Sequence, residues 1–144
     1  MIKTLYDTLV RLYQESEKPF PGIGLLVCND VSRIPAFPLY TSIPTLVGGD
    51  LYGGLLQLSG MQSPYHDGFH ILSDNLEITH TAQYFYPNPI HGMSLDPHKH
   101  YGARYFVAKI GSVLPDILLT AVVGSNYGVC VFQNGNVLTH YNND

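Results

Sequence analysis

The segment SPYHDGFHIL, residues 63–72, places an imidazole, a carboxylate and a glycine side by side as His66, Asp67 and Gly68. A carboxylate at the end of a sheet can hold a divalent cation or orient a hydroxyl group for deprotonation. The glycine would let a ligand approach the backbone closely. An ordinary Asp-Gly turn before a strand is the more common explanation of such a tripeptide, so these residues alone do not define a site.

A second candidate is the run Gly102-Ala103-Arg104, which opens a segment with helical periodicity. Free backbone N–H groups at the start of a helix attract phosphate, and an arginine there adds a charged donor. A glycine hinge followed by a solvated arginine would explain the same three residues. The run therefore indicates an anion site only in combination with other signals.

Histidines and aromatic residues supply two weaker signals. The chain has seven histidines, at positions 66, 70, 80, 91, 98, 100 and 140. Their spacing matches no zinc motif, so we expect no zinc site. Tyr84, Phe85 and Tyr86 end a predicted strand, where exposed rings could stack on a base for about 1–3 kcal/mol each. The same rings would serve equally well in a core or an interface.

Composition limits the class of protein. The 144 residues suit one domain spanning residues 1–144, and 45% hydrophobic with 12% charged residues excludes a disordered chain. A net charge of −4 gives no basic surface, so we expect no nucleic-acid partner. No apolar run approaches the roughly 20 residues that span a bilayer, so we expect a cytoplasmic protein without a membrane partner. Cys28 and Cys130 lie in apolar runs and are predicted to be buried free thiols.

The pattern of elements predicts an α/β fold. Apolar spacing indicates an amphipathic helix at residues 2–16 and a buried strand within 22–30, followed by an irregular proline-rich stretch at 31–44. Residues 50–60 are ambiguous between helix and strand because of Gly53 and Gly54. Two strands hinge at 73–75, and a loop covers 87–102. A helix beginning at Gly102 carries one apolar stripe and stops at Pro115; it is followed by a buried strand at 117–124 and a hairpin turning at Asn134-Gly135. We therefore expect a single domain with a central mixed, mostly buried β-sheet flanked by helices.

In order and spacing these segments resemble the diadenylate cyclase domain, the DisA-type nucleotidyltransferase that makes cyclic di-AMP from two ATP. The resemblance covers about residues 20–140. It runs through LYGGLLQLSGMQSPYHDGFHIL, LEITHTAQYFY, YGARYFVAKIGSV, DILLTAVVG and YGVCVFQNGNVL. It implies a bacterial type of domain that binds a nucleotide of the ATP or cyclic dinucleotide class. It also implies a homodimer of facing domains, or docking to an effector domain.

The resemblance assigns roles residue by residue. Asp67 takes the place of the catalytic, metal-associated aspartate, and His66 that of a histidine that joins the Mn²⁺ or Mg²⁺ of active members. The implied nucleotide-binding residues are Asp67, Gly68, Phe69, Tyr84, Phe85, Gly102, Ala103, Arg104, Tyr105 and Ser125. No cofactor is expected unless the domain is catalytic.

Departures from the family pattern point away from efficient catalysis. Phe69 replaces an alanine, Ala103 a threonine, Tyr105 a histidine and Phe106 an arginine of the phosphate motif. The turn GSNYG, residues 124–128, has no carboxylate where many members have acidic residues. Each lost donor of this kind can cost about 2.7–4 kcal/mol in a transition state. We therefore expect a non-catalytic or weakly catalytic nucleotide sensor. A divergent active cyclase and a protein-interaction module without a small-molecule site remain as alternatives.

Overall fold

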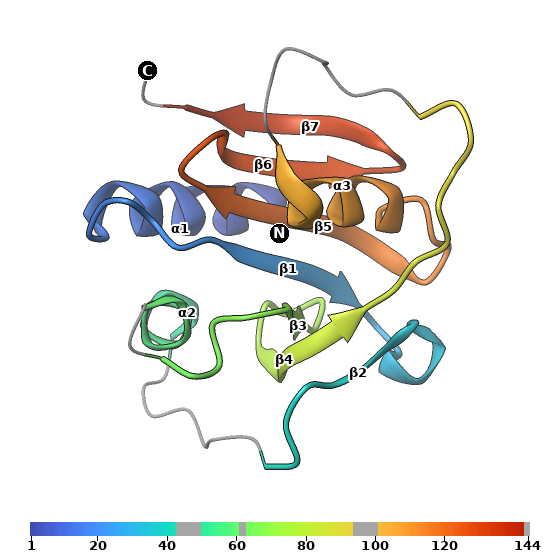
Figure 1. Ribbon diagram of the computed structural model, residues 1–144, viewed down its shortest axis with the longest axis horizontal. Coiled ribbons are helices and arrows are strands. Elements are labelled where there is room, and N and C mark those ends of the chain that lie inside the picture. Colours follow the sequence, from blue (N-terminus) through green and yellow to red (C-terminus); the bar gives the residue numbers. More distant parts are fainter. Residues whose placement is uncertain (43–49, 61–62, 94–100, 143–144) are drawn as a thin grey trace.

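The computed structural model describes residues 1–42, 50–60, 63–93 and 101–142, which form one α/β domain around a seven-stranded sheet (Figure 1). Along the sheet the strands follow the order β2-β4-β3-β1-β5-β6-β7. Their bounds are β1 Ile23–Cys28, β2 Ala36–Pro38, β3 Phe69–Leu72, β4 Ile78–Phe85, β5 Ile117–Gly124, β6 Gly128–Gln133 and β7 Asn136–Tyr141. The pair β1–β3 is parallel and the remaining pairs are antiparallel, which confirms the predicted mixed sheet.

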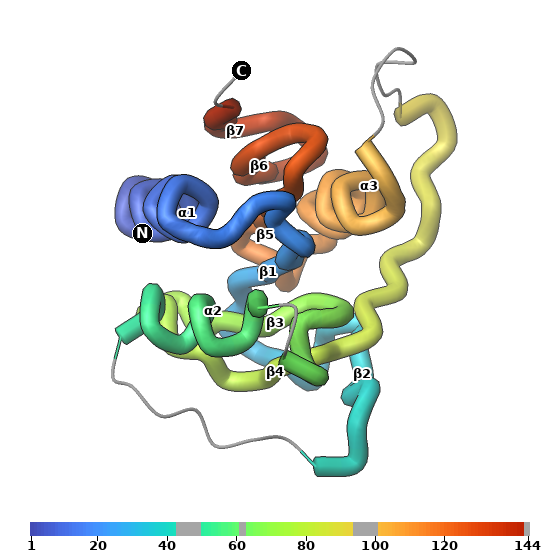
Figure 2. The backbone as a smooth tube through the Cα atoms, turned by 60° about the vertical axis from the view of Figure 1, so that its left-hand side comes forward, coloured from blue at the N-terminus to red at the C-terminus, as the bar shows by residue number. Residues whose placement is uncertain are grey.

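Helices cover both faces of the sheet. The helices are α1 Ile2–Glu15, α2 Leu51–Ser59 and α3 Gly102–Gly111, with a short 3₁₀ turn at Val31–Arg33. Figure 2 shows α1 and α3 on opposite sides of the central strands. Alternate residues of β1 divide between the two cores: Leu25 packs under α1 and α2, whereas Leu26 packs under α3. Among the described residues, no helix is long and apolar enough to cross a membrane.

The first helix forms as predicted, and the ambiguous segment is helical. In α1, Leu5, Leu9 and Leu12 are fully buried at helical spacing. In α2, the Asp50 carboxylate accepts a hydrogen bond from the Gly53 N–H at 2.8 Å and caps the helix. A Cβ at position 53 would lie 2.7 Å from that carboxylate oxygen, so the glycine that weakens the helix also makes room for its cap.

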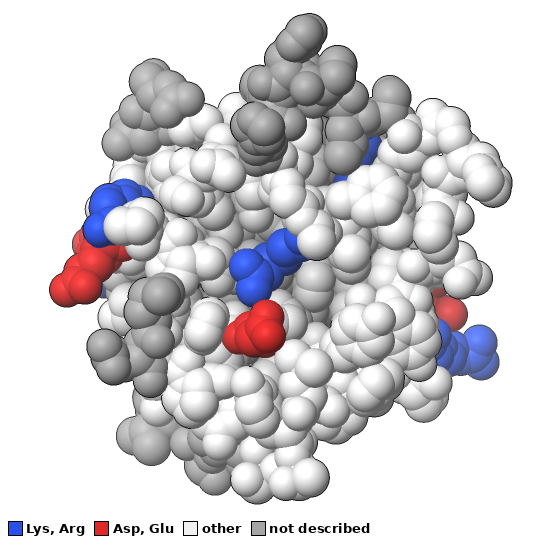
Figure 3. Space-filling view, in the orientation of Figure 1, with Lys and Arg blue, Asp and Glu red and all other residues white. Residues whose placement is uncertain are grey.

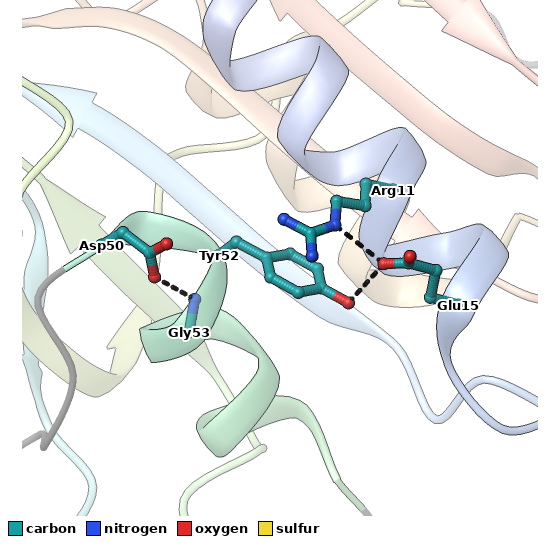
Figure 4. Close-up of polar contacts among 5 residues, drawn as sticks. All are labelled: Arg11, Glu15, Asp50, Tyr52 and Gly53. Carbon is teal, nitrogen blue, oxygen red and sulfur yellow. Dashed lines mark hydrogen bonds and ion pairs between the residues drawn. The ribbon is translucent and has the colours of Figure 1, made fainter.

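A polar contact joins α1 to α2. The Tyr52 hydroxyl donates a hydrogen bond to the Glu15 carboxylate at 2.8 Å, and the same oxygen accepts one from Arg11 Nε at 2.8 Å (Figure 4). The Arg11 guanidinium also lies 3.7 Å from the centre of the Tyr52 ring. These contacts hold the start of α2 against the last turn of α1.

The predicted apolar stripe on the helix from Gly102 is only partly correct. The sequence spacing placed six residues on that stripe: Ala103, Phe106, Val107, Ile110, Val113 and Leu114. Ala103 is exposed, and Val113 is exposed and lies beyond the end of α3. The buried residues of α3 are Tyr105, Ala108, Ile110 and Gly111, and of these only Ile110 belongs to the predicted stripe. A Cβ at Gly111 would lie 2.4 Å from the Phe85 ring, so small residues here let α3 approach the sheet closely. Close approach therefore matters more than the hydrophobicity of each position.

The hairpin and both thiols agree with the sequence predictions. Asn134 and Gly135 have φ angles of 53° and 81°, as a two-residue turn of this kind requires, and they join β6 to β7. Cys28 and Cys130 are buried, and neither forms a disulfide within the described part of the chain. The described part of the proline-rich stretch contains two features that the sequence did not reveal, the 3₁₀ turn at Val31–Arg33 and the three-residue edge strand β2.

The outer edge of β2 offers no free backbone N–H group to a further strand. Hydrogen bonds from Tyr86 N–H to Pro35 O and from Leu39 N–H to Ala82 O, both 2.9 Å, flank the pairing with β4. Because hydrogen-bonded pairs alternate along antiparallel strands, Ala36 and Pro38 turn their backbone nitrogens outward. The Ala36 N–H is bonded locally to Ile34 O at 2.8 Å, and proline has no N–H.

Candidate functional site

Seven of the ten residues predicted to bind a nucleotide line one cavity of about 390 Å³ on the side of the sheet that carries α3. We call it the α3 cavity. The loop before β3 and the start of that strand contribute Asp67, Gly68 and Phe69. The end of β4 contributes Tyr84 and Phe85, and the first turn of α3 contributes Ala103 and Arg104. Three segments that are distant in the sequence therefore meet at one place.

The Asp67-Gly68 turn is built so that only glycine fits its second position. Gly68 has a φ of +75°, and its N–H donates a hydrogen bond to the Asp67 carboxylate at 2.8 Å. A Cβ at position 68 would lie 2.5 Å from the carbonyl oxygen of Gln83 on β4. The turn thus packs directly on the neighbouring backbone, which brings the Asp67 carboxylate to the mouth of the cavity.

Arg104 and Asp67 form the charged part of the cavity. Arg104 Nη2 lies 3.7 Å from Asp67 Oδ1, with the arginine side chain 23% exposed and the aspartate 67% exposed. Nη1 of the same guanidinium packs against Gly22, where a Cβ would be only 2.5 Å away. On the face seen in Figure 3, one cationic and one anionic side chain meet near the centre, and mostly uncharged residues surround them.

Aromatic rings line the opposite wall. Phe69 and Phe85 are buried and meet edge to face with ring centres 5.2 Å apart. Tyr84 is half exposed and contacts Phe37 at 5.3 Å and Tyr86 at 5.5 Å between ring centres, forming an exposed aromatic cluster at the sheet edge. The cavity therefore combines apolar aromatic side chains with one ion pair.

The start of α3 leaves its backbone donors without a side-chain cap. Tyr101 occupies the cap position and makes no capping hydrogen bond, and the first turn has no acidic residue. Gly102 has a φ of +80° and no heavy atom within 4 Å of the position of an added Cβ. Such a helix start can accept an anion.

The remaining predicted residues lie elsewhere. Tyr105 points into the core, where it stacks on Tyr101 at 4.1 Å between ring centres and lines a separate cavity of about 200 Å³. Burial raises the pKa of the Tyr105 phenol well above its usual value. Ser125 and His66 line a third cavity of about 830 Å³, bounded by residues 15–21 and by Leu56 of α2. We call this the α2 cavity.

The metal ligands implied by the resemblance do not form a complete site in the described part of the chain. His66 Nδ1 is hydrogen-bonded to the Ser63 carbonyl at 2.8 Å, and Asp67 faces Arg104. The described residues hold no group of three or more histidine, cysteine or acidic side chains that could bind a metal. His98 and His100, also considered in the sequence, lie outside the described residues.

A buried histidine supports the strand that carries Tyr84. His70 is fully buried, and its Nδ1 accepts a hydrogen bond from the Ala82 N–H at 3.0 Å within a β-bulge where Ala82 has a φ of 50°. Its Nε2 has no partner among the described residues. Burial, followed by the positive charges of Arg104 and His66, lowers the pKa of His70 to about 4. The imidazole is therefore neutral at physiological pH.

Sequence reasoning missed three lining residues, Leu39, Gln83 and Val107. Val107 could have been found, because it lies one helical turn from Ala103 and Arg104. Gln83 is a buried amide that donates to the Thr81 carbonyl at 2.9 Å, and an uncharged polar residue before an aromatic pair is a weak signal. Leu39 follows a proline in an irregular segment, and its position depends on the pairing of β2 with β4.

The fold places this protein in a general structural class. It is a single α/β domain whose mixed seven-stranded sheet has helices on both faces and a cavity at the strand ends. No protein-family model and no curated protein matches the sequence. Among the solved structures that match is DacA from Staphylococcus aureus, as a double mutant. It has a TM-score of 0.65 and 16% identity, covering 99% of this chain and 89% of that one.

A second matching structure is titled a hypothetical membrane spanning protein from Bacillus cereus. It has a TM-score of 0.65 and 18% identity, covering 98% of this chain and 62% of that one. This chain thus spans less than two thirds of the Bacillus protein. At these identities the likeness establishes a shared fold, and fold alone does not determine activity.

Proposed function

We propose that this protein is a nucleotide-binding sensor domain with the diadenylate cyclase fold, with weak catalysis or none. Its ligand would be an adenine nucleotide or a cyclic dinucleotide held in the α3 cavity. The observation that carries the proposal is the convergence of Asp67, Arg104 and the Phe69–Phe85 wall on that one cavity. DacA, a diadenylate cyclase, shares the fold, which adds support from architecture.

Each wall matches one part of a nucleotide. The Phe69 and Phe85 rings offer an apolar surface for a base, and Tyr84 offers an exposed ring beside it. The Asp67 carboxylate can accept hydrogen bonds from ribose hydroxyl groups. Arg104 and the uncapped start of α3 supply donors for a phosphate. A cavity of about 390 Å³ lies within the usual range for small-molecule sites.

Two other functions each have one supporting observation. The exposure of Asp67 beside Arg104 would suit a divergent cyclase that deprotonates a ribose hydroxyl. The exposed cluster of Phe37, Tyr84 and Tyr86 would suit a protein-interaction module or a homodimer interface. A cytoplasmic location is proposed with the sensor function, because cytoplasmic nucleotides would then be available to it.

One incubation separates these functions. Purified protein is mixed with ATP and Mn²⁺, products are separated by chromatography, and bound nucleotide is quantified in the same sample. Bound nucleotide without product supports the sensor, and a panel of mono-, di- and cyclic nucleotides then ranks the ligands. Cyclic di-AMP that disappears in Asp67→Asn would establish the enzyme instead. The absence of both product and bound nucleotide would favour the interaction module.

Substitution of Arg104 tests the placement of the phosphate. Loss of a charge-assisted hydrogen bond costs about 1.5–3 kcal/mol, so Arg104→Ala should weaken nucleotide binding by about 10- to 100-fold. Lys109→Ala removes the same charge from the same helix outside the cavity and serves as the matched control. Equal affinities in the two variants would contradict a phosphate at Arg104.

A further inference from the structure

The Arg104–Asp67 ion pair lies between the α3 cavity and the α2 cavity. His66 lines the α2 cavity, and the next residue, Asp67, lines the α3 cavity. Pro21 lines the α2 cavity, and the next residue, Gly22, carries the Arg104 guanidinium against its backbone. Two chain segments thus cross from one cavity to the other at the ion pair.

The Arg104–Asp67 ion pair separates the two cavities only weakly. The charged atoms are 3.7 Å apart, longer than a good hydrogen bond, and the Asp67 side chain is 67% exposed. A phosphate that enters between the two side chains can bond to Arg104 in place of Asp67. An anionic group at this point would therefore connect the two cavities.

The α2 cavity is itself unsuited to phosphate. Glu15 and Glu17 line it, and hydrogen bonds to Glu15 from Tyr52 and then from Arg11 lower the pKa of that carboxyl (Figure 4). Lys18 also lines the cavity, but its ammonium group donates to the Tyr13 carbonyl and lies over the Tyr13 ring. The carboxylates repel a second anion and accept hydrogen bonds from hydroxyl and amino groups.

Further polar groups fit a neutral, hydroxyl-rich ligand in the α2 cavity. The Ser16 hydroxyl oxygen is buried and has no hydrogen-bond partner among the described residues. Ser59, another lining residue, is buried with 3% exposure. A cavity of about 830 Å³ with such a lining can hold one nucleoside.

We infer that the ligand is a dinucleoside monophosphate, with one nucleoside in each cavity and a single phosphodiester at Arg104. The inference rests on the proposed nucleotide-binding function and specifies its ligand. A nucleoside monophosphate fills the α3 cavity alone. A nucleoside triphosphate places extra negative charge towards Glu15 and Glu17, so its added phosphates bring no gain in affinity.

The test is calorimetric titration of the full chain with three sets of probes at one ionic strength, without divalent metal. The probes are the four nucleoside monophosphates, the four triphosphates and the sixteen linear dinucleoside monophosphates. We expect the tightest dinucleoside monophosphate to bind at least about 10-fold more tightly than the tightest monophosphate, because a second nucleoside is buried without a second binding entropy cost. Triphosphates should bind no more tightly than monophosphates.

Two neighbouring substitutions on α2 test the second cavity. Leu56→Trp places a large side chain at the α2 cavity, whereas Gln57→Trp places it on the exposed surface of the same helix. The affinity advantage of the dinucleoside monophosphate should fall to about one-fold in Leu56→Trp and persist in Gln57→Trp. Glu17→Lys should in turn raise the affinity for triphosphates.

The outcomes separate this inference from the function on which it rests. Equal binding of mono- and dinucleoside phosphates, or tightest binding of a triphosphate, would overturn the inference and leave the nucleotide site standing. No binding by any of the probes would overturn the inference, and a failure of cyclic dinucleotides to bind as well would overturn the proposed function. An advantage that survives in Leu56→Trp would show that the second nucleoside lies elsewhere and would also overturn the inference.

Discussion

Lowering the pH from 8 to 5 should destabilise the folded protein through His70. The imidazole is fully buried, and its pKa falls from 6.5 in the unfolded chain to about 4 in the folded one. Below pH 6.5 the unfolded state therefore takes up a proton that the folded state refuses. The contribution of the neutral His70 side chain to folding stability is fully present above pH 6.5, and it declines as the pH falls towards 4.

The size of the effect follows from the two pKa values. At pH 5 nearly all unfolded molecules carry the proton and few folded ones do, which corresponds to a loss of about 2 kcal/mol relative to pH 8. Urea unfolding at both pH values, followed by circular dichroism, measures this loss. In His70→Asn the pH-dependent loss should be smaller by about the same amount.

The control is His140→Asn, which makes the same substitution at an exposed histidine on β7. Acidic groups that titrate near pH 5 contribute equally to all three proteins and cancel in the comparison. Identical pH dependence in the natural protein and His70→Asn would refute the argument, because His70 would then titrate alike in both states.

Two glycine substitutions test the packing that builds the α3 cavity. Gly68→Ala places a side chain at a φ of +75° and against the Gln83 carbonyl, so the free energy of unfolding should fall by about 2–4 kcal/mol. The control Gly60→Ala adds a Cβ that meets no atom within 4 Å and should be nearly neutral. Equal stability of these two variants in urea unfolding would contradict the geometry of the turn. Gly111→Ala places a Cβ 2.4 Å from the Phe85 ring and should lower the free energy of unfolding by about 1–3 kcal/mol. It should also weaken nucleotide binding, which calorimetry measures. Unchanged affinity with lowered stability would mean that α3 does not shape the cavity.

Local signals were strong where one residue type has one physical role. Leucine spacing predicted α1, the Asn134-Gly135 turn predicted the last hairpin, and the apolar runs around Cys28 and Cys130 predicted buried strands. The order of these elements sufficed for the fold class. It also brought Asp67 and Arg104 to one cavity, although they are distant in the sequence.

Sequence patterns did not predict the features that depend on contacts between elements. Tyr105 follows Arg104 in the sequence yet faces the core, because Ala108 and Gly111 set the face on which α3 packs. The role of His70 depends on a bulge in β4 opposite it, and no pattern within either strand predicts that bulge. Leu39 enters the cavity through a three-residue edge strand that is too short to carry a periodic signal.

The two ends of the sheet differ in what they offer to another chain. At β2 the outward nitrogens are a proline and an N–H already bonded to Ile34, so a further strand finds no donor there. At the other end, residues 136–141 of β7 carry no charged residue or proline, and Val137 and Leu138 are exposed. Of the two end strands, β7 therefore offers the better edge for a further strand. Two copies paired through β7 would place β2, which has no free N–H to offer, at both ends of the joined sheet, and this would oppose continued growth into a fibre.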